Sequence, residues 1–421
     1  MTVRFNERQY DLFLSHAHAD RAFVEELYRW LTAEAGLKVF YDPEHGAPGS
    51  GISSMLRQEI ENCRGVVLVI SEASVDSKWV EDEYNMAEDE RGENPEFRIV
   101  PVRLNQAPGK RLVKGVSWVD VPEKRLTPPV ALALLRGVYG SRESLDPSRT
   151  RDVYVSASWQ TDPQSARAVS GALIERGFRL IGDAKDQKTF DLVRIERIMK
   201  TCGAFVCVVP FRDEERASAA DRPYKYYLQE MDLASELDLP SVIVADPRIR
   251  RVDVDDSGWL RMPTVAEAIP PEISRRLDLL SAEWEGAPMG NHVFLALPLE
   301  TEPSPQTSGL REVIRLVTDM SPIVGTDLQG QQQAEAIQGS LASAALVIGD
   351  LTGDNVNVCI EIGMAKATGR PYELICEGPS RSGPFMIRGP NIAFYESELG
   401  RLGALHRVAR PHRRRVLNAQ L

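Results

Sequence analysis

Three short apolar segments begin three similar stretches of the chain, about 140 residues apart. Each is rich in branched and aromatic side chains and precedes a helical pattern: residues 11–15 (DLFLS), 152–156 (DVYVS) and 292–296 (HVFLA). Short runs that are apolar throughout are typical of strands buried on both faces of a parallel sheet. The recurrence therefore predicts one structural unit used three times.

Three further landmarks follow each of these segments in the same order. The first is a second strand, at residues 36–42 and 177–183, with a weaker copy at 322–327. The second is a helix that leads into an apolar strand, at residues 56–70, 195–209 and 336–348. The third is a helix with a glutamate four residues before an alanine (Glu83 and Ala87, Glu230 and Ala234, Glu361 and Ala365), followed by strands at 98–102, 241–244 and 372–375. Four landmarks in one order are hard to obtain by chance.

Strands that alternate with helices at this spacing form βαβ units, and right-handed crossovers then give doubly wound sheets. We therefore expect an α/β protein with three tandem Rossmann- or flavodoxin-like domains and mainly parallel sheets. The expected domains are residues 1–140, 151–281 and 291–421. They are separated at 141–150 and 282–291, where the sequence is polar or contains glycine and proline.

Composition excludes several classes of function. The 421 residues carry a formal net charge of −11, so binding to nucleic acid or to an anionic membrane is not expected. No stretch reaches the roughly 18–20 apolar residues of a membrane helix, and the first residues lack the apolar core of a signal peptide. The five scattered cysteines indicate reduced thiols, and the six histidines show no metal-ligand spacing with them. We expect a cytoplasmic protein without a metal site.

Four motifs of the first unit occur together within residues 9–120. They are YDLFLSH at 10–16, GLKVFYDP at 36–43, the loop EHGAPGSG at 44–51, and SKWVEDE at 77–83. This set resembles the TIR domain family: its first and second strands, its BB loop and its Ser-x-Trp-x-x-x-Glu signature. Asp20 is expected to cap the helix that follows the first strand.

The resemblance implies cleavage of the bond between nicotinamide and ribose in NAD⁺, which would be a substrate, with no cofactor. Loss of neutral nicotinamide leaves a ribose with oxocarbenium character, and the Glu83 carboxylate would stabilise that charge. Attack by water would give ADP-ribose, and attack by an internal nucleophile would give a cyclic product; both stay open. The resemblance also implies self-association of the TIR domains.

Helical spacing places Trp79, Glu83 and Ala87 on one face of a helix. That face is expected at the carboxyl ends of the strands, where ligands bind in open α/β sheets. We expect Ala87 to leave room for a flat ligand and Trp79 to offer its π face to a ring. The other substrate-binding candidates are Phe13, Ser15 and Asp42. Glu81 and Asp82 are interpreted as acids that favour the first turn of a helix, and His16 and His18 as polar loop residues.

The second unit resembles a degenerate TIR domain. Glu230 and Tyr226 fall where Glu83 and Trp79 do, but the Ser-x-Trp element is missing. We interpret this unit as a structural or ligand-sensing copy.

The third unit has an Asp-x-Thr-x-x-Asn-x-Asn stretch before a Glu-x-Gly helix, within residues 346–365. It resembles the nucleoside 2-deoxyribosyltransferase-like superfamily. The resemblance implies a possible second site that binds a nucleotide-derived ligand, with Glu361 as nucleophile at a sugar carbon and with Asp350 and Asn357 holding the sugar. A scaffold role stays open.

After residue 401 the chain has five arginines, at 407, 410, 413, 414 and 415, and no acid. Such a block is usually a solvated tail, with contact to an acidic neighbouring subunit or to nucleic acid as the alternative.

These observations suggest a bacterial antiphage immune effector whose NAD⁺-cleaving activity is switched on when a ligand or partner drives oligomerisation through the C-terminal units. The alternatives are a non-enzymatic TIR adaptor, a nucleoside or nucleotide glycosidase in the third unit, and a TIR effector that senses cyclic oligonucleotides.

Overall fold

The computed structural model describes most of the chain. The described residues are 8–41, 52–74, 78–105, 107, 117–140, 151–157, 164–182, 192–211, 225–249, 258–283, 292–298, 305–328, 333–378, 392–413 and 415–416. No described helix is long and apolar enough to cross a membrane.

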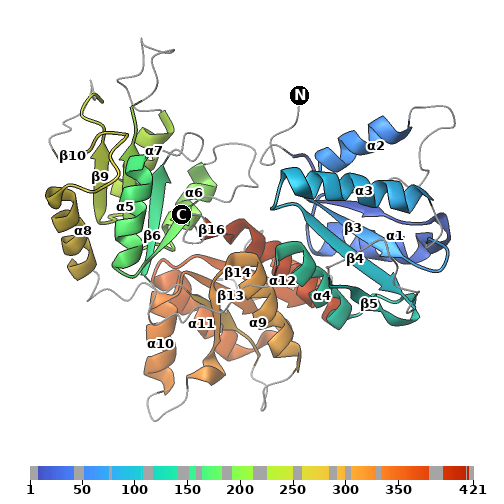
Figure 1. Ribbon diagram of the computed structural model, residues 1–421. Helices are drawn as coiled ribbons and strands as arrows, with labels where there is room; N and C mark the ends of the chain where they lie inside the picture. The colour runs from blue at the N-terminus through green and yellow to red at the C-terminus, as the bar shows by residue number, and fades with distance from the viewer. Residues whose placement is uncertain are drawn as a thin grey trace.

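The first unit is a five-stranded parallel sheet with helices on both faces (Figure 1). Its elements are β1 (Leu12–Ser15), η2 (His18–Asp20), α1 (Arg21–Arg29), η3 (Trp30–Glu34), β2 (Val39–Phe40), α2 (Ile52–Glu61), β3 (Gly65–Ile70), α3 (Lys78–Glu93), β4 (Arg98–Leu104), β5 (Val119–Val121), η4 (Pro122–Lys124) and α4 (Pro128–Tyr139). The strand order is β2-β1-β3-β4-β5. α2 and α3 pack on one face, and α1 and α4 on the other.

The second and third units contain the same alternation of strands and helices. The second has β6 (Arg151–Ala157), α5 (Gln164–Glu175), β7 (Phe178–Gly182), α6 (Leu192–Met199), β8 (Ala204–Val209), α7 (Lys225–Glu236), β9 (Ser241–Ala245), β10 (Leu260–Arg261) and α8 (Pro271–Glu283). The third has β11 (His292–Ala296), α9 (Pro305–Thr318), β12 (Ser321–Val324), η7 (Gly325–Asp327), α10 (Gln333–Ser343), β13 (Leu346–Asp350), η8 (Thr352–Asp354), α11 (Val356–Ala367), β14 (Tyr372–Glu377), β15 (Ile392–Tyr395), α12 (Glu398–Ala409), η10 (Arg410–His412) and β16 (Arg415–Val416).

The repeat predicted from the sequence is confirmed at the level of topology. The second sheet runs β10-β9-β8-β6-β7, and the third runs β12-β11-β13-β14-β15, so each unit has the flavodoxin-like order 2-1-3-4-5. The central pairs also share one register, because Phe13, Tyr154 and Phe294 lie opposite Val66, Phe205 and Val347. The predicted α/β fold is therefore correct. The expected linkers fall mostly outside the described residues, and α8 continues to Glu283, inside the second of them.

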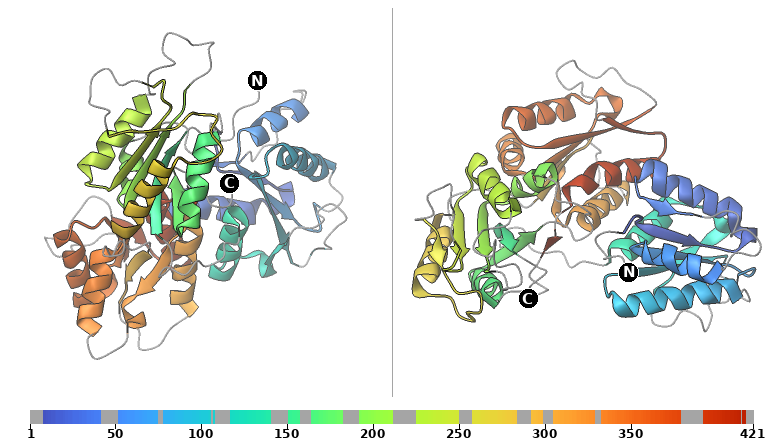
Figure 2. Two further views of the ribbon diagram at one scale, coloured as in Figure 1. Left: turned by 60° about the vertical axis from the view of Figure 1, so that its left-hand side comes forward. Right: turned by 90° about the horizontal axis from the view of Figure 1, so that it is seen from above.

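The first and third units share one hydrophobic core. A single cluster of buried side chains runs from α1 and α4 through α12 and α9 to β11 and β13. Figures 1 and 2 show α12 between the sheet of the third unit and the helices of the first. Arg136 of α4 adds a two-pronged ion pair with Glu312 of α9. Because apolar surface from both units is removed from water here, the two units are expected to dock firmly.

α12 reaches the first unit through polar contacts as well. Trp30 donates its ring N–H to the carbonyl of Leu399 at 3.0 Å. His406 is fully buried, with Nδ1 donating to the Ala35 carbonyl at 2.6 Å and Nε2 accepting from the Tyr139 hydroxyl at 2.7 Å. Gly403 brings the helix close to η3, because a Cβ at this position would lie 2.7 Å from the Cβ of Glu34.

The expectation that the C-terminal arginines form a solvated tail is wrong for Arg407, Arg410 and Arg413, whereas Arg414 and the side chain of Arg415 lie outside the described part of the structure. Arg407 donates to the Ala33 carbonyl at 2.9 Å, Arg410 pairs with Asp11 at 2.6 Å, and Arg413 lies over the Tyr139 ring at 4.9 Å. Arginines of α12 and η10 therefore contact backbone carbonyls and a carboxylate near the start of the TIR-like unit. Charge composition cannot distinguish such an interface from a tail, because the partner lies about 400 residues away in the sequence.

The two-residue strand β16, which follows η10, joins the third unit to the second. β16 pairs antiparallel with β7, as Arg415 lies opposite Gly182 and Val416 opposite Ile181. It adds a sixth strand to the second sheet, and its pairing with β7 is the one antiparallel strand pair in the described part of the chain.

Candidate active site

Glu83 and Ser15 form the centre of the candidate site. Ser15 is the last residue of β1, and its hydroxyl donates to the carboxylate of Glu83 on α3. Both side chains are almost fully buried. The site therefore lies at the carboxyl end of a central strand, as predicted. A carboxylate held there by a hydroxyl group has a fixed position from which to stabilise a nearby positive charge.

Phe13 lies two residues before Ser15 on the same face of β1. Its ring stacks on Phe40 of β2 with centroids 5.6 Å apart and an interplanar angle of 10°. Phe13 is 3% exposed and belongs to the core between the sheet, α2 and α3. Phe13 therefore packs in the core beside Ser15 and helps to fix the position of β1.

The expected role of Ala87 is wrong. Ala87 has no exposed surface, and it packs in the core with Val66 and Tyr84. Its small side chain lets α3 approach the sheet and leaves no room for a ligand. Helical spacing correctly placed it on the face of Glu83, but this part of the face points at the strands.

Two candidate residues lie partly or wholly outside the described part of the structure. The backbone of Trp79 is in the first turn of α3, but its side chain is not among the described atoms. Asp42 and the loop at 44–51 are outside the described residues. Their roles stay predictions.

Sequence reasoning missed a polar cluster beside the site. Asp20 does not cap α1 as expected: it occupies the N-cap position but makes no capping hydrogen bond. Its carboxylate accepts from the Ser71 hydroxyl at 2.5 Å and pairs with Lys124 at 2.9 Å. Ser71 directly follows β3, so this buried cluster lies at the same end of the sheet as Ser15. The one signal in the sequence that could have indicated this cluster was the position of Ser71 and Ser74 shortly after an apolar strand.

The two histidines near β1 differ in their surroundings. His16 follows Ser15, is 1% exposed, and its ring lies 5.3 Å from that of Tyr41. The interpretation of His16 as a polar loop residue therefore missed its burial. His18 is exposed.

The second unit preserves the pair of serine and glutamate. Ser156, which corresponds in register to Ser15, donates to Glu230 on α7. A tyrosine replaces Phe13, and its hydroxyl adds a second hydrogen bond to Glu230, from Tyr154 at 3.1 Å. Both oxygens of the Glu230 carboxylate thus have partners inside the unit, which favours a structural role.

The third unit lacks the serine. Ala296 occupies its register position, so Glu361 on α11 receives no such hydroxyl group. Burial raises the pKa of Glu361 to about 7. Its carboxylate faces η7, where a Cβ on Gly325 would lie 3.6 Å from one oxygen. A carboxyl group near its pKa at neutral pH can accept or donate a proton.

The other two candidates of the third unit are not joined to Glu361 by any contact recorded among the described residues. Asp350 is completely buried and is held by the hydroxyls of Tyr395 at 2.8 Å and Thr352 at 2.6 Å and by Arg401 at 2.9 Å. Asn357 is exposed in the first turn of α11. Asp350 therefore orders the turn after β13, and its oxygens are already occupied.

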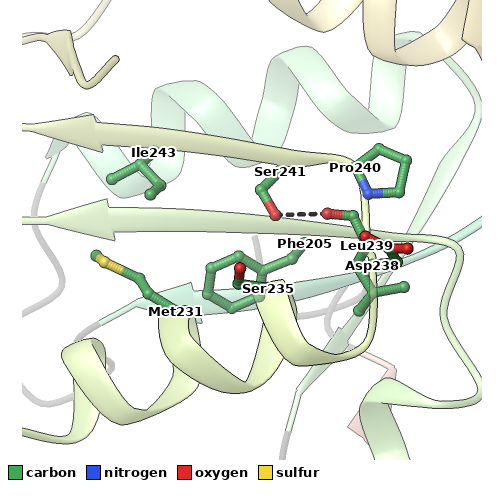
Figure 3. Close-up of a pocket in the computed structure, with 8 residues that line it drawn as sticks. All are labelled: Phe205, Met231, Ser235, Asp238, Leu239, Pro240, Ser241 and Ile243. Atoms are coloured by element: carbon green, nitrogen blue, oxygen red, sulfur yellow. Dashed lines mark hydrogen bonds between the residues drawn. The ribbon is translucent and has the colours of Figure 1, made fainter. Parts of the chain in front are cut away.

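A cavity of about 380 Å³ in the second unit lies at the wrong end of the sheet for a nucleotide crevice (Figure 3). It is bordered by Phe205 near the start of β8, Ser241 at the start of β9, and Asp238 after α7. The Ser241 hydroxyl donates to the Leu239 carbonyl at 2.8 Å. This cavity is at the amino ends of the strands, and Glu230 is not among the residues that line it. Among the described residues, no group of three or more histidine, cysteine or acidic side chains could hold a metal ion.

Among known protein families, residues 12–131 match the family model for the TIR domain. This part of the chain is a TIR domain. A relative named as a probable 2' cyclic ADP-D-ribose synthase TcpO, from Methanobrevibacter olleyae, is 32% identical over 81 residues, which are 19% of this chain and 24% of that relative. The chain thus matches about a quarter of that protein's length.

A crystal structure of the TIR domain of the Toll-related receptor TRR-2 from Hydra magnipapillata also matches. The identity is 18%, the TM-score is 0.23, and the match covers 27% of this chain and 84% of that one.

Proposed function

We propose that the TIR domain cleaves the bond between nicotinamide and ribose in NAD⁺, with Glu83 as the catalytic carboxylate. The observation that carries the proposal is the buried pair of Ser15 and Glu83 at the carboxyl end of β1. The name of the TcpO relative, which specifies synthesis of a cyclic ADP-ribose, supports the same substrate.

The reaction needs a group that stabilises positive charge. When the glycosidic bond breaks, its electron pair leaves with the pyridinium nitrogen, so neutral nicotinamide departs and the ribose carbon becomes electron-poor. The Glu83 carboxylate faces that carbon, and the hydrogen bond from Ser15 keeps it in place. Water then adds with loss of a proton to give ADP-ribose, or a nucleophile within the same molecule adds to give a cyclic product.

Release of nicotinamide from NAD⁺, followed by chromatography, tests the proposal. The assay uses the full chain over a range of concentrations, because TIR domains commonly self-associate. Glu83→Gln should lower the rate at least about 100-fold, as expected for loss of a preorganised charge. Ser15→Ala should lower it about tenfold, the effect of one hydrogen bond to a charged group.

Glu81→Gln is the matched control. Glu81 is on the same helix, two residues from Glu83, but it is exposed. Its variant should keep the wild-type rate. Absence of release from the wild type at every concentration, or equal release from Glu83→Gln, would contradict the proposal. The same chromatogram separates linear from cyclic ADP-ribose.

The wider role that fits this activity is a cytoplasmic antiphage immune effector, inactive until a ligand or partner bound by the second and third units drives assembly. The shared core of the first and third units supports it, because helices of the third unit pack in one hydrophobic cluster with α1 and α4. Mass photometry with and without NAD⁺ tests assembly. A monomer that is fully active at nanomolar concentration would refute the model.

A second candidate is a site for a nucleoside derivative in the third unit. The observation that favours it is the pKa of Glu361, which burial of its carboxyl group raises to about 7. Incubation with nucleosides and release of free base test for chemistry, and Glu361→Gln is the variant. Release that persists in Glu361→Gln would exclude this residue.

A further inference from the structure

A cavity of about 440 Å³ lies where the second and third units meet. α6 forms one side, and β14, β15 and α12 form the others. Its floor is apolar, with Ile392, Ala393 and Val408. The volume is within the range of small-molecule sites. None of the three glutamates described above lines it, so this cavity is separate from the candidate active sites.

The charged groups around the cavity have an excess of positive charge. Two arginines line it, Arg197 from α6 and Arg407 from α12. Glu373, the one acidic group among the described residues that line it, is paired with His412 at 2.8 Å. In the described part of the chain, no hydrogen bond or ion pair is recorded for Arg197, which is only half-exposed. Arg407 uses one N–H group on the Ala33 carbonyl, and a guanidinium group has five.

We propose that this cavity binds a small phosphorylated ligand of nucleotide size. Arg197 and Arg407 would hold the phosphate, since guanidinium groups match phosphate oxygens in charge and geometry. The apolar floor would receive a flat ring. The separation of charged walls from an apolar base is typical of sites for ligands that have one anionic and one apolar end.

Such a ligand would contact the second and third units directly and would be linked to the first unit through Arg407. Arg197 belongs to the second unit, and Arg407 belongs to the third and is bonded to Ala33 of the first. A bound phosphate would therefore bridge units that are otherwise joined here by η10 and the short strand β16. Binding should raise the melting temperature of the full chain. The proposal is independent of NAD⁺ cleavage at Glu83.

Isothermal titration calorimetry of the full chain tests the site with two probes, inorganic phosphate and AMP. Both should bind the wild type, and Arg197→Gln should weaken binding at least about tenfold, because it removes a charge-assisted contact. Arg276→Gln is the control: this arginine is exposed on α8 of the same unit and should leave affinity unchanged. AMP should bind more tightly than phosphate, because the apolar floor receives its ring, and equal binding of the two probes would overturn the proposal of a ligand of nucleotide size.

A substitution that is expected to increase affinity distinguishes loss of this site from a general folding defect. Glu373→Gln removes a negative charge beside the cavity while keeping an acceptor for His412, so phosphate should bind more tightly. Absence of binding to the wild type at millimolar concentrations, or equal affinity of the wild type and Arg197→Gln, would overturn the proposal. Weaker binding to Glu373→Gln would do the same.

Discussion

His406 couples the docking of α12 on the TIR domain to pH. Its ring is buried between the first and third units and is bonded to Ala35 and Tyr139. Because the Ala35 carbonyl can only accept, Nδ1 carries a proton, and in the neutral ring Nε2 accepts from the Tyr139 hydroxyl. Burial, together with the positive charges of Arg410 and Arg413, lowers the pKa of His406 from 6.5 to about 3.

The sign of the effect follows from the lowered pKa. A neutral ring is favoured in the docked state, so the contribution of His406 is fully present above its undocked pKa of 6.5 and is lost as the pH falls toward about 3. Between about pH 7 and about pH 5 protonation of the undocked ring lowers the docking equilibrium constant by about 1.4 powers of ten, equivalent to about 1.4 pKa units. At 1.36 kcal/mol per unit, docking weakens by about 2 kcal/mol.

Hydrogen exchange followed by mass spectrometry measures this locally, which suits a chain of several units that need not unfold in one step. Peptides that cover α12 and η3 are compared at the two pH values after correction for intrinsic exchange. Protection in the wild type should fall about 25-fold between them. His406→Gln cannot titrate, so its protection should start lower and change little with pH.

Peptides of α8, far from His406 in the second unit, serve as the internal control. Equal pH dependence of α12 in the wild type and in His406→Gln would refute the reasoning. It would mean that the ring stays hydrated or that another group controls docking.

Two further substitutions test the packing between and within units. Gly403→Ala places a Cβ 2.7 Å from the Cβ of Glu34 and should destabilise the docked state by about 1–3 kcal/mol. The control is Gly339→Ala on α10, whose Cβ meets nothing within 4 Å and which should be neutral or slightly stabilising. Melting temperatures compare the two variants, and a Gly403→Ala variant as stable as the wild type would contradict the close approach. Asp152→Ala removes the partner of the buried Arg179, which donates at 2.6 and 2.9 Å, and should cost about 3–5 kcal/mol in urea unfolding, with a loss below about 1 kcal/mol as the contrary result.

The topology was predictable because it depends on local patterns. Buried parallel strands and amphipathic helices leave a signal in each short window of sequence, and the threefold recurrence multiplied that signal. The position of Glu83 was predictable for the same reason, since helix periodicity places it on the sheet side of α3. The partner of its carboxylate, Ser15, is the last residue of a strand that the pattern had already located.

Contacts between units could not be predicted in this way. The apolar positions of α12, such as Leu402 and Leu405, indicate that the helix is buried but not against which surface. The same limit explains why the contacts of the basic residues were missed. Composition alone suggests that Arg410 is solvated, and its partner Asp11 is brought close only by the fold. The prediction that Asp20 caps α1 was wrong for a related reason, because its carboxylate pairs with Lys124, which is distant in the sequence.

The pairing of β16 with β7 sets an order of events during synthesis. Val416 lies beside Ile181, so the ribosome has to add more than two hundred residues, including the whole third sheet, before the edge of β7 can be covered. Nascent domains generally fold from the N-terminus as they emerge. The second unit would therefore wait with an open strand edge, which is a surface prone to pair with other chains. Slow translation or truncation before Arg415 would prolong that exposure, so this short strand, once made, covers an edge prone to aggregation in addition to joining two folded units.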